Sequence, residues 1–448
     1  DIFFMSSLKT QTSTIKAPLF SDQVEKTVDL RDTLSISDVR FDQFECPQEF
    51  YGNIQQLRVH DRPLHSNIIP IVRTEEKEGK TVSHNYGHGP FGWTVLFGNV
   101  NHSILNFEKF LIDKKADLED IKQTKEVSVL GMGCFGLTTA LTLHYRGYKK
   151  IRVIAENKDM LISHMAGGLI NYVPLDRITC PRKRELLNNW MLDTHMTCKA
   201  ISEGNHIFSE LLKDDIQLIN LYTDHVDYDD IGLTYLASLN IVERPKRVKL
   251  ILGTQENPII SEEHFHIKAY LIHSEKYLKH VYDQLERLGI PCEQRKVESF
   301  GEVNSEFIFN CTAFGSKQLN DDNNLLSACG HGLILANQDL SQKLDFVLIY
   351  RSTVPGLKGH PADGTVYFMP KKDNLFLGGT YMRDYDGSNR RINQKEWSKL
   401  CKRARWLFHG VHPDDQDSLK ASKVNKKERT TKGKLNKGFI EEKLIPKF

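Results

Sequence analysis

A glycine motif at residues 129–136 (VLGMGCFG) has the residue types and spacing to bind the phosphates of a dinucleotide. Gly131 permits a tight turn, Gly133 lets the backbone approach a pyrophosphate, and Gly136 lets the next helix pack against the preceding strand. The N-terminus of that helix offers N–H groups and a positive dipole end to the phosphates. Glu156 ends the next predicted strand, where a carboxylate accepts hydrogen bonds from a ribose. The alternative is a structural turn with an exposed Glu156, and the motif does not distinguish NAD from FAD.

The elements that must position this motif follow from hydrophobic patterning. Residues 126–152 read as strand, glycine turn, helix and second strand, which is the start of a βαβ unit. Further helices are expected at 104–111, 184–212, 277–288 and 397–408, and buried strands at 307–310 and 346–350. The pattern predicts an α/β protein with a parallel sheet around the motif.

The composition is that of a soluble globular protein with more than one domain. Its 448 residues predict about two or three domains. A net charge of +2 gives no global attraction to nucleic acid or to an anionic membrane. No apolar run approaches the ~18 residues that span a bilayer. The eight cysteines form no CxxC pair, which argues against a disulfide scaffold and favours a reducing compartment, so we expect a cytoplasmic protein.

Six other short segments carry specific local signatures. They are 165–169 (MAGGL), 294–300 (QRKVESF), 309–312 (FNCT), 367–370 (YFMP), 377–379 (LGG) and 84–94 (HNYGHGPFGWT). Together they resemble the D-amino acid oxidase family, and the last string closely matches that family's flavin loop. The resemblance implies FAD as cofactor. It also implies a Rossmann-like FAD-binding domain and an α+β substrate domain with a mixed or antiparallel sheet.

The order of these segments differs from the family. In the family the glycine motif opens the chain and the flavin loop closes it, whereas here the loop at 84–94 comes before the motif at 129–136. A circular permutation explains this order most simply, because natural chain ends are often close in space. A tandem fragment of a longer protein is the alternative.

The expected domain layout follows from the permuted order. Residues 1–40 are an N-terminal extension, 41–112 a segment that completes both sites, and 113–125 a charged linker. The FAD-binding domain comprises 126–185 and 290–330, and the substrate domain 186–289 and 331–410. Residues 411–448 form a basic tail that we expect to be solvated and disordered, with contact to nucleic acid as the alternative.

The resemblance implies a set of residues around the flavin. Besides Gly131, Gly133, Gly136 and Glu156, they are Cys134, Phe135, Asn157, Ser163, Gly167, Gly168, Leu169, Val297, Thr312, Gly89, Gly92, Trp93 and Thr94. Histidines such as His84 and His88 have no partners at metal-ligand spacing, so no metal is expected.

The substrate residues are also implied by the resemblance. Arg62 is the first choice for binding a carboxylate, because a guanidinium makes two parallel hydrogen bonds, and Arg58 is the second. Tyr367 corresponds to a tyrosine that contacts the carboxylate, and Asn171 lies where a polar residue approaches the amine. Pro90 stands where the family has glycine and a carbonyl that accepts from the amine; proline keeps the carbonyl but fixes φ.

Three functions stay open on the sequence alone. The first is oxidation of a D-amino acid to an oxo acid, ammonia and hydrogen peroxide, with dioxygen as electron acceptor. The second is a related flavin dehydrogenase or glycine oxidase. The third is a non-catalytic scaffold, since fold resemblance alone does not establish activity. The expected partner is a small-molecule substrate, an amino acid that the sequence does not name, and a homodimer is left open.

Overall fold

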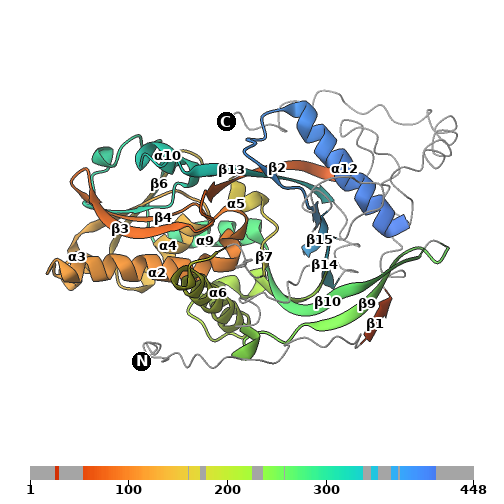
Figure 1. Ribbon diagram of the computed structural model, residues 1–448. Coiled ribbons are helices and arrows are strands. Elements are labelled where there is room, and N and C mark those ends of the chain that lie inside the picture. The colour runs from red at the N-terminus through yellow and green to blue at the C-terminus, as the bar shows by residue number, and fades with distance from the viewer. Residues whose placement is uncertain are drawn as a thin grey trace.

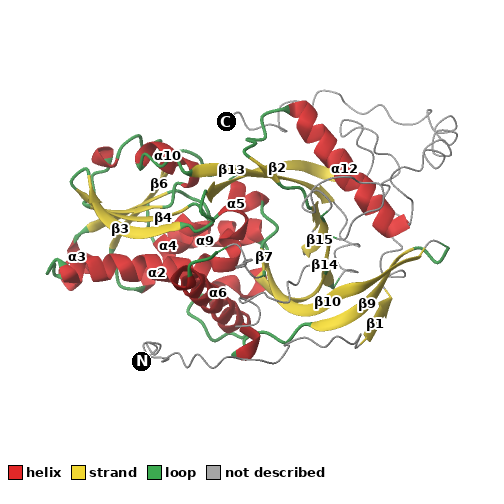
Figure 2. Ribbon diagram, viewed as in Figure 1, coloured by secondary structure: helices red, strands yellow, loops and turns green. Residues whose placement is uncertain are grey.

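The structure, a computed structural model, describes residues 26–29, 54–159, 161–171, 178–224, 236–256, 258–335, 345–351, 365–371 and 374–409. The described residues form two regions that lie side by side (Figure 1). One holds a six-stranded sheet with most of the helices, and the other holds a larger curved sheet (Figure 2). This mixed α/β architecture confirms the expected fold class.

The six-stranded sheet has the order β11-β6-β5-β12-β4-β3. The bounds are β11 Cys292–Gln294, β6 Lys150–Ala155, β5 Glu126–Leu130, β12 Phe307–Asn310, β4 Lys80–Tyr86 and β3 Ile71–Lys77. The pairs from β11 to β4 are parallel, and β3 is antiparallel to β4. The central strands β5 and β12 are buried and mostly apolar, as expected for parallel strands covered on both faces.

Long helices cover one face of this sheet, and the short helix α10 (Ser316–Leu319) and the 3-10 turn η4 (Phe300–Glu302) lie on the other. The helices are α2 Gly92–Asp113, α3 Leu118–Thr124, α4 Cys134–Tyr145 and α9 Ser274–Arg287. Strand β12 shows the two-residue alternation: Phe307 and Phe309 join the helix-side core, whereas Ile308 joins a cluster with Phe300 on the opposite face. The sheet is therefore held from both sides of its central strand.

The larger sheet has eleven strands, nine of them in the order β1-β9-β10-β8-β14-β15-β16-β13-β17, with β2 on β13 and β7 on β10. The bounds are β1 Lys26–Asp29, β2 Ile54–His65, β7 Leu169–Ile170, β8 Ile216–Thr223, β9 Lys246–Gly253, β10 Pro258–Ile272, β13 Leu325–Leu335, β14 Phe346–Tyr350, β15 Val366–Lys371, β16 Asn374–Gly378 and β17 Met382–Arg383. Strands β2 and β13 run together from one region to the other (Figure 1).

The remaining helices connect and cover these sheets. They are α5 Ile162–Met165, α6 Pro181–Ser202, α7 Ser209–Leu212, α10 Ser316–Leu319 and α12 Arg390–His409, with 3-10 turns η2 Gly89–Phe91, η3 Lys213–Asp215, η4 Phe300–Glu302 and η5 Ala313–Gly315. No helix of the described residues is long and apolar enough to cross a bilayer.

Some expected elements are longer than predicted. The helix expected at 104–111 begins twelve residues earlier, at Gly92. The linker at 113–125 contains helix α3, and the extension at 1–40 contributes β1, which pairs in parallel with β9 at the sheet edge. The basic tail at 411–448 lies outside the described residues.

Candidate active site

Two loops far apart in the sequence meet at one edge of the six-stranded sheet. Strand β12 pairs in parallel with both β4 and β5, and Asn310 is the register partner of both His84 and Leu130. Since carboxyl ends of parallel strands share an edge, the flavin-loop string that follows β4 and the glycine turn that follows β5 are brought together. The two loops therefore lie together even though the flavin loop precedes the glycine motif in the sequence.

The glycine turn has the geometry that phosphate binding needs. At Gly131 φ is +109°, and a Cβ there would lie 2.5 Å from the carbonyl oxygen of Cys311, so the fold itself requires glycine. A Cβ at Gly136 would lie 1.9 Å from the carbonyl oxygen of Gly131. A Cβ at Gly133 would meet only the Ser163 hydroxyl, at 3.1 Å. Gly133 therefore borders a space that protein atoms leave open at the N-terminus of α4, where an anion is favoured.

His88 joins the two loops. Its ring stacks on Phe135 of the glycine motif, with centroids 3.6 Å apart and planes 10° apart. Its Nε2 lies 3.0 Å from Asn85 Oδ1 and 3.1 Å from Asn99 Oδ1, two acceptors, so Nε2 carries the hydrogen. Burial lowers the pKa of His88 to about 3, and the ring is neutral at physiological pH. An uncharged imidazole thus holds the two loops against each other.

Acid is expected to destabilise the protein through His88. Its pKa in the folded state lies below the usual 6.5, so the unfolded chain binds the proton first as the pH falls. Stability is therefore lost from pH 6.5 downward toward the folded pKa, at up to about 1.4 kcal/mol per pH unit for this one group. Denaturant unfolding of wild type and His88→Gln between pH 6.5 and about 4.5 should show a shallower decline for the variant. Equal slopes would contradict the assignment.

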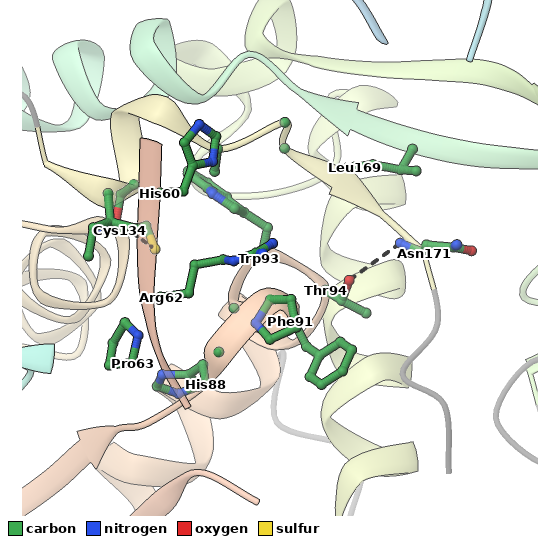
Figure 3. A pocket seen from close by; sticks show the side chains of 18 of the residues that line it. His60, Arg62, Pro63, His88, Phe91, Trp93, Thr94, Cys134, Leu169 and Asn171 are labelled. Atoms are coloured by element: carbon green, nitrogen blue, oxygen red, sulfur yellow. Dashed lines mark hydrogen bonds between the residues drawn. The ribbon is translucent and has the colours of Figure 1, made fainter. Parts of the chain in front are cut away.

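A cavity of about 340 Å³ lies where the loops meet the larger sheet (Figure 3). Many of the residues expected at the site line it: Arg62, Gly89, Pro90, Gly92, Trp93, Thr94, Cys134, Phe135, Ser163, Gly167, Gly168, Leu169, Asn171 and Tyr367. They come from β2, the loop before α2, the start of α4, the segment from α5 to β7, and β15. The sequence therefore identified residues that the fold gathers around one cavity.

Other expected cofactor residues lie beside this cavity. Gly131, Gly133 and Gly136 form the turn next to it, and Thr312 stands between two lining residues, Cys311 and Ala313. Three others lie farther out, beyond the carboxyl ends of β6 and β11: Glu156, Asn157 and Val297. Glu156 and Asn157 are exposed, and Val297 packs against the core cluster of Ile308.

Two glycines of the larger sheet, Gly330 and Gly378, leave room for the side chains of Arg62 and Tyr367. A Cβ at Gly330 would lie 2.6 Å from Arg62 Nη2, and a Cβ at Gly378 would lie 2.7 Å from the Tyr367 hydroxyl. Side chains at these two sheet positions would displace the guanidinium and the phenol. Arg62 Nε donates to the Ala328 carbonyl at 2.8 Å, whereas Nη2 is buried without a hydrogen-bond partner among the described residues. The cavity wall thus presents a donor that a bound anion can satisfy.

Arg58, the second choice for binding the carboxylate, makes its side-chain contacts outside the cavity. It is buried, forms an ion pair with Glu275, and donates from Nη1 to the His164 carbonyl at 3.3 Å. It does not line the cavity. Of these two arginines it is therefore Arg62 that lies at the cavity wall, and its buried Nη2 has no hydrogen-bond partner among the described residues.

Asn171 and Pro90 both lie at the cavity wall. The backbone N–H of Asn171 donates to Thr94 Oγ1 at 3.4 Å, which ties the end of β7 to the start of α2 (Figure 3). Pro90 is exposed within the 3-10 turn η2, where its fixed φ is compatible with the backbone. Gly89 before it has φ +58°, and a Cβ there would lie 2.5 Å from Leu64.

The two cysteines that line the cavity, Cys134 and Cys311, are free and buried. Burial raises the pKa of the Cys134 thiol to about 11 and that of Cys311 to about 12. Both are therefore protonated at neutral pH and are poor nucleophiles. Among the described residues, no group of three His, Cys, Asp or Glu side chains could hold a metal ion.

Ala313 occupies a backbone position that suits glycine. Its φ is +56°, which costs an L-residue roughly 1–2 kcal/mol. Ala313→Gly should therefore raise the free energy of unfolding by about 0.5–1 kcal/mol, after the added entropy of the unfolded chain is subtracted. Denaturant unfolding measures this change. Ala140→Gly inside α4 is the matched control and should lower stability by about 1 kcal/mol; a loss at both positions would refute the argument.

Sequence reasoning assigned no role to several cavity residues, notably His60, Thr365 and Met369, although Met369 lies inside the 367–370 segment that resembles the family. His60 had a readable signal, because it alternates with Arg58 and Arg62 and therefore shares their face of the strand. Thr365 and Met369 border Tyr367 on the same strand region, but nothing in their types indicates a site. The alternation rule would have found the first of these three.

The comparisons with known proteins agree with this geometry. A family model described as "DAO: FAD dependent oxidoreductase" matches residues 126–423, more than half of the chain. The protein belongs to this family. It is an FAD-dependent oxidoreductase, and the open space beside Gly133 at the start of α4 fits the pyrophosphate of FAD. The match begins at β5, so the segment with β2, β4 and α2 lies outside it.

The relatives of this FAD-dependent oxidoreductase are distant. It is 22% identical over 285 residues to D-amino-acid oxidase of Dictyostelium discoideum, over 61% of this chain and 70% of the relative. Glycine oxidase from Bacillus cereus ATCC 14579 is 13% identical with a TM-score of 0.40, over 63% of this chain and 77% of that one. Fructosyl amine:oxygen oxidoreductase (Amadoriase I) from Aspergillus fumigatus is 16% identical with a TM-score of 0.37, over 57% and 62% respectively. The chain spans less than two thirds of the length of this amadoriase.

Proposed function

We propose that the protein oxidises a D-amino acid to an imino acid and passes the electrons to dioxygen. The observation that carries this proposal is Arg62, a half-buried residue of the cavity wall whose Nη2 atom is buried without a hydrogen-bond partner among the described residues. A buried charged donor is costly unless a ligand of opposite charge satisfies it. A carboxylate is the anion whose two oxygens match a guanidinium. The D-configuration is supported by the resemblance and by the name of the Dictyostelium relative.

In such a reaction, different residues of the cavity bind the carboxylate and the amine of the substrate. Bound FAD supplies the hydride acceptor that no side chain provides. Arg62 and the Tyr367 hydroxyl hold the substrate carboxylate, and the Pro90 carbonyl accepts a hydrogen bond from the amine. These contacts fix the α-carbon, which removes much of the entropic barrier to hydride transfer. A neutral amine needs no strong base. The products are the imino acid and hydrogen peroxide, and water then converts the imino acid to an oxo acid and ammonia.

An anaerobic titration tests the proposal. Protein reconstituted with FAD is mixed with a panel of D-amino acids and their L-enantiomers, and the flavin absorbance near its visible maximum is followed. We expect bleaching by at least one D-amino acid, and recovery with hydrogen peroxide formation when air is admitted. Bleaching that only artificial acceptors reverse would indicate a dehydrogenase instead. A protein that stays colourless after FAD is added would indicate a non-catalytic scaffold.

We also propose that the chain order arose by circular permutation. Its support is that β12 lies between β4 and β5 in one parallel sheet, although β4 precedes the matched family region and β12 lies within it. A rearranged gene that places residues 54–113 after residue 409 through a flexible linker should give a folded protein that binds FAD. An insoluble or colourless product would contradict this origin.

A further inference from the structure

His60 is a cavity residue that neither the sequence nor the family match assigned. It lies two residues before Arg62 on β2, and both side chains leave the strand on the same side (Figure 3). The register partner of His60 on β13 is Gly330, the glycine over which Arg62 Nη2 lies. The imidazole and the unpartnered end of the guanidinium are therefore neighbours at one place in the cavity wall.

The imidazole is buried but incompletely satisfied. His60 is only 5% exposed, and its ring stacks on Phe376, with centroids 5.6 Å apart and planes 17° apart. Its Nε2 has no hydrogen-bond partner among the described residues. A buried polar atom without a partner costs roughly 1–3 kcal/mol, so its retention beside a ligand cavity indicates a ligand contact.

The surroundings of His60 decide its charge. Burial lowers its pKa well below the usual value, and the neighbouring basic groups act in the same direction: Arg62 and Arg58 on its own strand, His331 on β13 and Lys371 on β15. The ring is therefore neutral, with one nitrogen as donor. It adds a hydrogen bond to the site without adding a second charge beside Arg62.

We propose that His60 determines specificity for a carboxylate together with Arg62, by donating a hydrogen bond from Nε2 to the carboxylate that the guanidinium holds. The two unpartnered polar atoms of this wall, Arg62 Nη2 and His60 Nε2, are then satisfied by one ligand group. The inference rests on the proposed function, because it assumes that Arg62 binds the substrate carboxylate. It adds a donor from a strand position to which the family resemblance assigned no role.

The test uses propionate, a carboxylate with no amine and no reactive C–H at the site. Its affinity for the FAD-loaded protein is measured by calorimetry and by the perturbation of the flavin spectrum. We expect His60→Leu to bind propionate about 10- to 100-fold more weakly than wild type, because a hydrogen bond to a charged group is lost. His60→Gln keeps an N–H donor and should stay within about threefold. Asp61→Asn, on the opposite face of β2, is the matched control and should bind as wild type does.

The outcomes separate the two proposals. Wild-type affinity in His60→Leu, or a Gln variant as weak as the Leu variant, would overturn the role of His60 and leave Arg62 as the carboxylate ligand. Failure of wild type itself to bind propionate would overturn the carboxylate site, and with it both proposals. Unchanged FAD content and melting temperature in the variants show that a loss of affinity is not a loss of fold.

Discussion

Replacing Gly133 with valine is expected to give a folded protein that no longer binds FAD. The backbone at Gly133 is extended, with φ −75° and ψ −177°, a conformation that valine adopts readily. Only the Ser163 hydroxyl lies near the new Cβ, at 3.1 Å, so the fold accommodates the side chain. The branched side chain would instead fill the space at the start of α4 where the pyrophosphate approaches. The visible flavin spectrum and calorimetric titration with FAD measure this loss.

A control glycine tests whether the effect is local. Gly301→Val places the same side chain at an exposed position of η4, where a Cβ has ordinary contacts. This variant should stay yellow and bind FAD as wild type does. A yellow Gly133→Val protein with unchanged FAD affinity would show that the glycine turn does not hold the dinucleotide.

Replacing Arg62 with alanine should raise the substrate KM by about 10²- to 10³-fold and spare the flavin. Removing one partner of a hydrogen-bonded charge pair costs about 2–5 kcal/mol, and a change of 10²- to 10³-fold, about 2.7–4.1 kcal/mol, lies within this range. The effect should appear mainly in KM and kcat/KM, because the carboxylate contact is present both before and during hydride transfer. Steady-state kinetics with the best D-amino acid of the panel measures it, and the flavin spectrum serves as the check on cofactor loading.

Arg58→Ala is the matched comparison for this prediction. It removes the ion pair with Glu275 and the bond to the His164 carbonyl, so it should lower stability while KM stays near the wild-type value. The reverse pattern, with KM raised by Arg58→Ala and unchanged by Arg62→Ala, would move the carboxylate site to Arg58.

Local sequence patterns predicted the central strands of both sheets. The apolar runs at Phe307–Asn310 and Phe346–Tyr350 coincide with β12 and β14, because a strand buried on both faces reads as an uninterrupted apolar segment. The helix expected at 277–288 is α9, shifted by a few residues, since one face of this helix is apolar and the other charged. Elements whose burial is visible in the residue types are thus readable from sequence.

Helix α2 shows why other elements could not be predicted from the sequence. Its first half is buried on all sides and includes polar and small residues such as Thr94, Gly98 and Asn99, so it has no apolar stripe. Gly98 lies against α6, where a Cβ would be 2.4 Å from the Trp190 carbonyl oxygen. Packing on α6 explains Gly98, and the hydrogen bonds with Asn171 and His88 explain Thr94 and Asn99. No spacing in the sequence reveals such contacts.

The site was predictable as a set of residues but not as a geometry. The motifs named most of the cavity lining, whereas the choice between Arg62 and Arg58 depended on where Glu275 lies, more than two hundred residues later in the chain. The importance of His60 depended in the same way on the pairing of β2 with β13. Long-range partners of this kind are fixed by the fold as a whole, and a single sequence does not display them.

The position of β12 between β4 and β5 has a consequence for synthesis on the ribosome. Strand β4 leaves the ribosome about 220 residues before β12, its parallel neighbour. At roughly 5–20 residues per second, the β3–β4 hairpin waits on the order of ten to forty seconds with one edge uncovered. The nascent chain should therefore depend on chaperones during this interval, and it gains a place for the dinucleotide only after most of its length has emerged.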